Sequence, residues 1–185
     1  MPHRAVAWYS LRVDGTELIM ETLHYTRMES MAGPLLIGVS AQGLVVLEFD
    51  RGRLPANPKN ARWEESKNAT LAYVLQLREY FDGTRREFEF PLDLRGTDFQ
   101  LRCWRALLQI PYGETRSYAD IAQAVGTPHG FRAVGMANNR NPVAIVVPCH
   151  RVIASDGTLC GYGGGLDVKR KLLELEGALT SILAA

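Results

Sequence analysis

The apolar positions of the chain first form two short runs around a turn. GPLLIGVSAQGLVVLEF, residues 33–49, contains two β-rich apolar segments that Ala41-Gln42-Gly43 separates. Two such segments around a short Gly-containing turn predict a β-hairpin. The next stretch is rich in Pro, Asn and charge, which predicts a surface loop over residues 51–64.

A helical pattern follows this loop. In SKNATLAYVLQLREYFDG, residues 66–83, the apolar side chains that recur close to helical spacing are Leu71, Val74, Leu75, Leu77 and Phe81. We expect an amphipathic helix that ends at Gly83 and packs on the sheet of the hairpin. FEFPLDLRGT, residues 88–97, alternates apolar and polar positions until Gly96 breaks the pattern. A domain boundary is therefore predicted near residues 90–97.

Helical patterns dominate beyond this boundary. Thr97-Asp98 can cap a helix over FQLRCWRALLQI, whose apolar stripe consists of Phe99, Cys103, Leu107 and Ile110. Ser117 can cap a short helix that Gly126 ends, and TPHG then leads into a third helix over FRAVGMANNR. Two short helices joined by a tight Gly-containing turn predict a helix-turn-helix. A further helical pattern is VKRKLLELEG, residues 168–177.

These patterns together predict an α/β protein of two domains. Residues 1–22 are expected to be an N-terminal extension, residues 23–95 a domain with a small β-sheet and a helix, and residues 96–185 a helical domain. With 46% hydrophobic and 22% charged residues, the composition is that of a soluble globular protein. No run approaches the roughly 18 apolar residues of a membrane span, and the first residues lack the apolar segment of a signal peptide.

Charge and cysteine content narrow the range of possible partners, locations and metal sites. The formal net charge of +1 excludes a large basic field, so any nucleic-acid binding must rest on a local patch and on shape. Three cysteines without a CxxC pair favour free thiols and a cytoplasmic location. The four histidines do not pair with cysteines at metal-ligand spacing, so we expect no metal site.

IVVPCHRVIAS, residues 145–155, places a thiol beside an imidazole after a strand-like apolar run over residues 143–147. A thiol is a useful nucleophile only as thiolate, which a base such as His150 can promote, and Glu176 is a candidate to orient that base. Side chains of adjacent residues diverge on a strand, so contact between Cys149 and His150 would need a turn at Pro148 or a bridging water.

The cysteines also have a simpler interpretation. A small buried hydrophobic residue is the commonest fate of a free cysteine, and on the Cys-His pair alone this alternative outweighs catalysis for Cys149. Cys103 lies on an apolar helical stripe and is expected in the core. Cys160, in GTLCGYGGG, is expected to be a loop thiol.

Longer motifs surround the Cys-His pair. PCHRV, residues 148–152, is preceded by RAVGMANNRNP and followed by GYGGGLDVKRKLLELEG. This combination resembles the active-site region of the O6-alkylguanine-DNA alkyltransferases, also called methylated-DNA–protein-cysteine methyltransferases. The resemblance runs from the GPLL segment to Gly177, and DFQLRCWRALLQIPYGETRSYADIA supports it. It implies a ribonuclease H-like N-terminal domain and a winged helix-turn-helix in the C-terminal domain.

The resemblance also implies the chemistry. Cys149 would accept the alkyl group of O6-alkylguanine in duplex DNA once per molecule, with O4-alkylthymine as a further candidate substrate. His150 would keep Cys149 as thiolate through a water, and Glu176 would orient His150. Tyr118 would turn the target phosphate and contact the flipped base, and Asn141 would be the hinge between the recognition helix and the active-site strand. The substrate pocket would include Pro148, Val152, Tyr162 and Gly163.

DNA contacts are implied for the third helix of the C-terminal half. Arg132 matches the arginine that enters the base stack in place of the flipped nucleotide, and Gly130, Ala133 and Gly135 give a surface with little bulk for minor-groove binding. Phe131 is bulkier than the small residue expected beside that arginine. The resemblance implies a monomer that needs no cofactor and binds duplex DNA.

Each of these assignments has a plainer alternative. An arginine on a helix is by default a solvated charge, a tyrosine at a helix start packs, an asparagine before proline stops a helix, and small residues allow tight helix packing. The alternative functions are a lesion-binding protein without an acceptor cysteine, a regulator that uses the helix-turn-helix alone, and a cysteine hydrolase. The presence of Cys149 disfavours the first, lesion preference would disfavour the second, and no acyl pocket marks the third.

Overall fold

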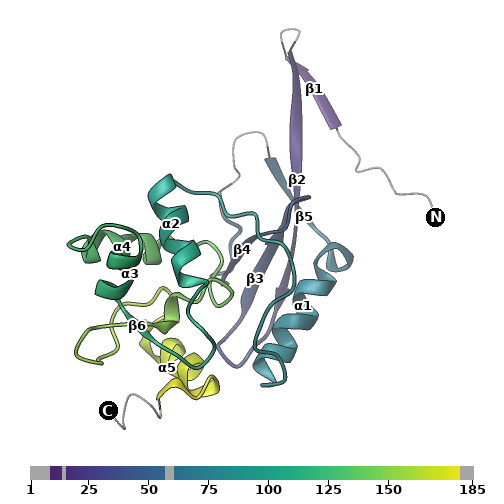
Figure 1. The fold of residues 1–185 in the computed structure, drawn as a ribbon. Coiled ribbons are helices and arrows are strands. Elements are labelled where there is room, and N and C mark those ends of the chain that lie inside the picture. The colour runs from purple at the N-terminus through teal and green to yellow at the C-terminus, as the bar shows by residue number, and fades with distance from the viewer. Residues whose placement is uncertain (1–8, 14–15, 57–60, 180–185) are drawn as a thin grey trace.

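The computed structural model describes residues 9–13, 16–56 and 61–179 of the chain. A β-sheet with one helix comes first in the sequence and a group of helices follows it (Figure 1). This is the predicted two-domain α/β arrangement, with an N-terminal sheet and C-terminal helices. In Figure 1, the C-terminal helices α3 and α4 lie on the far side of the molecule from α1.

The N-terminal sheet confirms the predicted hairpin. Its strands are β1 (Tyr9–Val13), β2 (Thr16–Met28), β3 (Leu35–Val39) and β4 (Leu44–Phe49), which pair in that order, each antiparallel to the next. The segment predicted as an extension therefore contains β1 and the first part of β2, while residues 1–8 and 14–15 lie outside the described residues.

The predicted loop over residues 51–64 is wrong at its end. β5 (Ala61–Glu65) begins within it and pairs in parallel with β2. The Trp63 ring meets the Tyr25 ring edge-on at 6.3 Å and leaves no room for a side chain at Gly38, where a Cβ would come within 2.7 Å of it. Pairing and packing with distant segments thus override the polar composition of the stretch, as is usual for strands.

The predicted helix is α1 (Lys67–Phe81), which packs on β2 and β3. The Ser66 side chain caps it by accepting a hydrogen bond from the Ala69 amide. The predicted apolar face is only partly correct, because Leu71 and Leu75 are exposed. The fully buried positions are Thr70, Leu77 and Tyr80. The buried stripe is therefore rotated toward Tyr80, whose hydroxyl reaches the second half of the chain.

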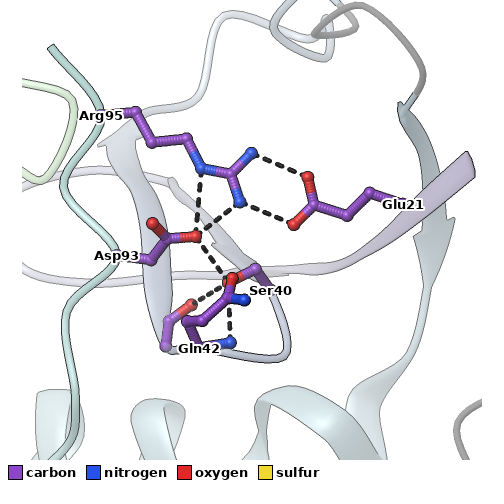
Figure 2. A network of polar contacts seen from close by, with 6 residues as sticks. Glu21, Ser40, Gln42, Asp93 and Arg95 are labelled. Carbon is purple, nitrogen blue, oxygen red and sulfur yellow. Dashed lines mark hydrogen bonds and ion pairs between the residues drawn. The ribbon is translucent and has the colours of Figure 1, made fainter. Parts of the chain in front are cut away.

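A polar network holds the segment between the two halves against the sheet (Figure 2). Both terminal nitrogens of the Arg95 guanidinium donate to the Glu21 carboxylate, at 2.6 and 2.8 Å, and its Nε donates to Asp93 at 3.0 Å. Asp93 also accepts from the Ser40 hydroxyl at 2.7 Å. The partly exposed ion pairs contribute little stability each, but together they fix the path of the chain at the edge of β2 and after β3.

The C-terminal half contains α2 (Asp98–Leu107), α3 (Tyr118–Ala124), α4 (Phe131–Asn139) and α5 (Leu166–Leu175). The predicted caps are confirmed, since Thr97 and Ser117 each take part in a capping box. Short strands β6 (Arg116–Ser117) and β7 (Val152–Ile153) pair in parallel. The Trp104 indole donates to the Ala137 carbonyl at 3.0 Å and so joins α2 to α4.

The expectation of a strand over residues 143–147 is wrong. Only Val143 forms a β-bridge, with Leu47 of β4, and the following residues turn, with Ile145 at a φ of 72°. A short 3₁₀-helix, η1 (Cys149–Arg151), follows directly. Val143, Ile145 and Val147 are all buried. The apolar run thus correctly indicated burial, but a buried run does not distinguish a strand from a packed turn.

Candidate active site

Cys149 opens η1 and is held by Asn141. The Asn141 amide nitrogen donates to Sγ of Cys149 at 3.2 Å and to the Val147 carbonyl at 2.8 Å, while its oxygen accepts from the Val143 amide at 3.0 Å. Asn141 therefore fixes the turn that leads into Cys149. Burial raises the pKa of the Cys149 thiol, and the Asn141 hydrogen bond only partly opposes this effect. The group rests as a thiol at neutral pH and needs a base to become a nucleophile.

His150 is the candidate for such a base. Its Nε2 lies 2.9 Å from Oε1 of Glu176, and both side chains are fully buried. Because an ionised carboxylate only accepts hydrogen bonds, Nε2 carries the proton and Nδ1 keeps its lone pair. Nδ1 is buried and has no hydrogen-bond partner among the described residues. Burial lowers the pKa of His150 despite the nearby Glu176 carboxylate, so the ring is neutral at pH 7.

Glu176 accepts hydrogen bonds from two residues that the sequence analysis did not identify. Arg151 donates from Nε to Oε2 at 2.8 Å and from Nη2 to Oε1 at 2.9 Å, and the Tyr80 hydroxyl donates to Oε1 at 2.7 Å. Burial alone would raise the pKa of Glu176, but hydrogen bonds from His150 and Arg151 outweigh it and hold the pKa well below its ordinary value. The carboxylate is therefore ionised and keeps His150 in one orientation.

A cavity of about 790 Å³ opens beside Cys149. Tyr118, at the start of α3, lines it together with Cys160, Tyr162 and Gly163. Burial, with a smaller effect of Cys160, raises the pKa of the Tyr118 hydroxyl, so this group stays protonated and can donate a hydrogen bond into the cavity. A thiol, a hydrogen-bond donor and apolar walls thus face one space large enough for a small planar ligand.

The predicted pocket residues divide into two pairs. Tyr162 and Gly163 line the cavity of Cys149, whereas Pro148 and Val152 do not. Pro148 faces a different cavity next to Arg151, and Val152 is fully buried in the core. Pro148 and Cys149, although adjacent in the chain, thus line different cavities, and Val152 begins β7.

The loop around Gly163 is held from two sides. The Tyr162 ring lies edge-on to Phe49 of β4 at 5.8 Å and to His150 at 6.5 Å. Lys169, a buried cation that the sequence analysis also missed, donates from Nζ to the carbonyls of Val152 at 2.5 Å and Cys160 at 2.8 Å. These contacts fix the wall of the cavity that Cys160, Tyr162 and Gly163 form.

The predicted DNA-contact residues occupy the start of α4. Arg132 and Ala133 are exposed, while Gly135 lies beside Tyr118, whose ring would be 3.7 Å from a Cβ at that position. At Gly130 a Cβ would lie 2.9 Å from the Thr127 hydroxyl oxygen, so tight packing of the preceding turn already accounts for this glycine. Cys103 is buried in the core, as predicted.

The described residues contain no group of three or more His, Cys, Asp or Glu side chains that could hold a metal ion. Within the same ranges no helix is long and apolar enough to cross a membrane. Cys103, Cys149 and Cys160 are all free thiols.

Comparison with known proteins places this geometry in a family. Residues 23–94 match the family model described as "6-O-methylguanine DNA methyltransferase, ribonuclease-like domain", and residues 98–178 match the model described as "6-O-methylguanine DNA methyltransferase, DNA binding domain". The chain belongs to the 6-O-methylguanine DNA methyltransferase family. Cys149, His150 and Glu176 of this methyltransferase all lie within the residues that match the DNA-binding-domain model.

Individual relatives agree with the family models. The methylated-DNA–protein-cysteine methyltransferase of Mycobacterium tuberculosis is 50% identical over 154 residues, which cover 83% of this chain and 92% of the relative. The protein of the same name from Methanosarcina barkeri is 48% identical over 158 residues, covering 83% and 97%. Crystal structures of the M. tuberculosis O6-methylguanine methyltransferase, and of OGT from that organism in complex with DNA, each superpose with a TM-score of 0.77 at 49% identity, over 84% of this chain and 93% of theirs.

Proposed function

We propose that this methyltransferase repairs DNA by moving the alkyl group of O6-alkylguanine onto Sγ of its own Cys149. The observation that carries the proposal is the cavity that Cys149 shares with Tyr118, backed by a neutral His150 with a free Nδ1. A lesion-binding protein without chemistry would need neither a thiol nor a base at this place. Family membership, and a relative solved in complex with DNA, support duplex DNA as the partner.

The proposed reaction begins with a proton transfer. The Cys149 thiol gives its proton to Nδ1 of His150, through a bridging water, and the ionised Glu176 stabilises the imidazolium that forms. The thiolate attacks the alkyl carbon in line with the C–O6 bond; a C–S bond forms as the C–O bond breaks, and its electron pair leaves with guanine. Tyr118 donates its hydroxyl hydrogen to the departing base and so offsets the developing negative charge.

The alkylated cysteine is a thioether, and the described residues offer no group that could remove its alkyl carbon. Each molecule therefore reacts once. O4-alkylthymine presents an analogous alkyl–oxygen bond and is a further substrate for the same geometry.

Cys149 is only 8% exposed. This burial supports nucleotide flipping, because a base that stays stacked in the duplex cannot bring its O6 into the cavity. We assign the minor groove to the start of α4, where Ala133 and Gly135 add little bulk and Arg132 is free to enter the base stack. Asn141, two residues after the end of α4, links this surface to Cys149. The paired strands β6 and β7, with β6 in contact with α3, support a winged helix-turn-helix.

The remaining proposals concern the whole chain. The family-model matches favour an N-terminal domain at residues 23–95, of ribonuclease H-like type, and a C-terminal domain at residues 96–185. Since one chain carries nucleophile, base and cavity, we propose that it acts as a monomer without a cofactor. We also propose that it acts on DNA in the cytoplasm.

The proposal is tested on the DNA. Increasing amounts of protein are mixed with duplex carrying O6-methylguanine, and the remaining lesion is counted by nucleoside chromatography. The proposal predicts loss of one lesion per protein molecule and none with Cys149→Ser, while Cys103→Ala, which changes a core thiol, keeps the stoichiometry. Binding of the lesion without loss of its methyl group, or repeated turnover, would contradict it.

A further inference from the structure

α4 carries an exposed aromatic side chain that the proposed reaction does not use. Phe131 is the first residue of α4, and its side chain is 48% exposed. Phenylalanine is among the residues most often found fully buried in proteins. The same side chain lines the cavity that contains Cys149 and Tyr118. Phe131 therefore stands at the rim of the active-site cavity, with part of its ring open to whatever approaches α4.

The burial of Cys149 determines how a substrate base can reach it. Cys149 lines the cavity and is only 8% exposed, so an alkylated guanine has to leave the base stack to reach it. Its departure costs stacking and pairing, and it leaves the faces of the neighbouring bases open. A flat apolar ring recovers stacking with any base, because every base has a π-face. Proteins that enter the minor groove use phenylalanine among their wedge residues for this purpose.

We propose that Phe131 and Arg132 form a two-residue wedge, in which the Phe131 ring stacks on a base that the departing nucleotide leaves exposed. This inference rests on the proposed function, because it needs a base that leaves duplex DNA. The Arg132 guanidinium carbon lies 5.9 Å from the centre of the Phe131 ring, within the range of a cation–π contact. The Arg132 guanidinium therefore stays beside the Phe131 ring. The cation can pair with DNA phosphates while the ring stacks on a base.

Two features of α4 favour this role over a simple cavity wall. The first three residues of the helix, Phe131 to Ala133, are all exposed, and the next, Val134, is fully buried. Val134 thus packs the first turn of α4 against the core, while the side chains of residues 131–133 lie at the surface. The preceding residue, Gly130, has no side chain that could cover the ring.

The experiment compares a substrate that must be flipped with one that need not be. Single-turnover alkyl transfer is measured from duplex DNA carrying O6-methylguanine and from the free base O6-benzylguanine, whose benzylic carbon reacts readily with sulfur. The variants are Phe131→Ala, Phe131→Leu, which keeps apolar bulk without a flat ring, and Phe131→Tyr, which keeps the ring. Leu71→Ala, which removes an equally exposed apolar side chain from α1, is the matched control.

The wedge predicts that Phe131→Ala lowers the ratio of duplex rate to free-base rate by about tenfold, the size expected for one lost base–aromatic stack. The ratio for Phe131→Leu should lie between those of Phe131→Ala and the unsubstituted chain. Phe131→Tyr and Leu71→Ala should leave the ratio unchanged. An equal loss with both substrates would show that the ring only lines the cavity, and an unchanged duplex rate would show that it does nothing; either result overturns the wedge. No transfer by the unsubstituted chain from either substrate would instead contradict the proposed function.

Discussion

Glu176 is the residue on which the geometry of the site depends. Its two oxygens accept hydrogen bonds from His150, Arg151 and Tyr80, which lie on η1 and on α1. A buried carboxylate is costly unless its acceptors are satisfied, and Arg151 also supplies the compensating charge. The same contacts fix the proton of His150 on Nε2 and leave Nδ1 without a hydrogen-bond partner among the described residues. The tautomer of the base is thus set by partners far apart in the sequence.

Tyr80→Phe tests this arrangement because it removes one donor and keeps the ring. Loss of a buried hydrogen bond to a charged group is expected to cost about 1.5–3 kcal/mol in the free energy of unfolding, measured with urea. Methyl transfer should also slow, since Glu176 then holds His150 less firmly.

Tyr73→Phe, on the same helix, is the matched control. The Tyr73 ring packs against Phe90 at 4.7 Å, and within the described residues its hydroxyl makes no hydrogen bond to another side chain. Its removal should change stability by no more than about 0.5 kcal/mol. Equal effects of the two substitutions would show that the Tyr80 hydroxyl contributes nothing to Glu176.

Helices could be predicted from the sequence more reliably than strands or loops. The starts of α2 and α3 follow from Thr97 and Ser117, because a cap is a local interaction between neighbouring residues. β5 and the turn over residues 143–147 were predicted wrongly, because both depend on contacts with β2 and β4 that local composition does not encode. Tyr80 escaped detection for the same reason: it lies 96 residues from Glu176.

The loop that carries Tyr162 is predicted to depend on one glycine. A Cβ at Gly164 would lie 2.5 Å from the Phe49 ring, whereas a Cβ at Gly163 would meet nothing within 4 Å. Gly164→Ala must therefore push the loop away from β4, at a cost typical of overpacking, about 1–3 kcal/mol. The displaced Tyr162 should also slow methyl transfer.

Thermal unfolding of Gly164→Ala and Gly163→Ala checks this prediction. The Gly163 variant should unfold within a degree or two of the unsubstituted chain, since a surface substitution changes stability by about 0.5 kcal/mol or less. If both variants lost the same stability, backbone freedom of the loop would matter rather than the contact with Phe49.

The two halves of the molecule share one hydrophobic core, and the site lies where they meet. Residues of β3 and β4 cluster with residues of α2, α4 and the turn before Cys149. From the N-terminal half, the Tyr80 hydroxyl donates to Glu176 and the Phe49 ring contacts the Tyr162 ring. The N-terminal half is therefore predicted to be needed for the activity of the C-terminal half, although Cys149, His150 and Tyr118 all lie in the latter.

Stability should depend on pH through two buried groups. The folded pKa of His150 lies below its ordinary 6.5, and that of Glu176 lies below its ordinary 4.5. Both groups bind protons more readily in the unfolded chain, so their contributions are complete above these ordinary values and are lost as the pH falls through the folded ones. The melting temperature without DNA should decline below about pH 6.5 and more steeply below about pH 4.5.

Glu176→Gln provides the comparison for this pH dependence. It should be less stable at pH 7, because Arg151 loses its charged partner, and its melting temperature should vary less between pH 5 and pH 3. A melting temperature of the unsubstituted chain that stays constant from pH 7 to pH 4 would contradict the arrangement of buried charges.

The most direct measurement is intact-mass spectrometry with peptide mapping, after the protein has been incubated with excess duplex DNA carrying O6-methylguanine. We predict that one methyl group replaces the thiol hydrogen of Cys149 in every molecule, and that Cys149→Ser gains no mass. Lesion-selective binding with no added mass, or a methyl group on Cys103 or Cys160 instead, would contradict the assignment of Cys149 as the acceptor.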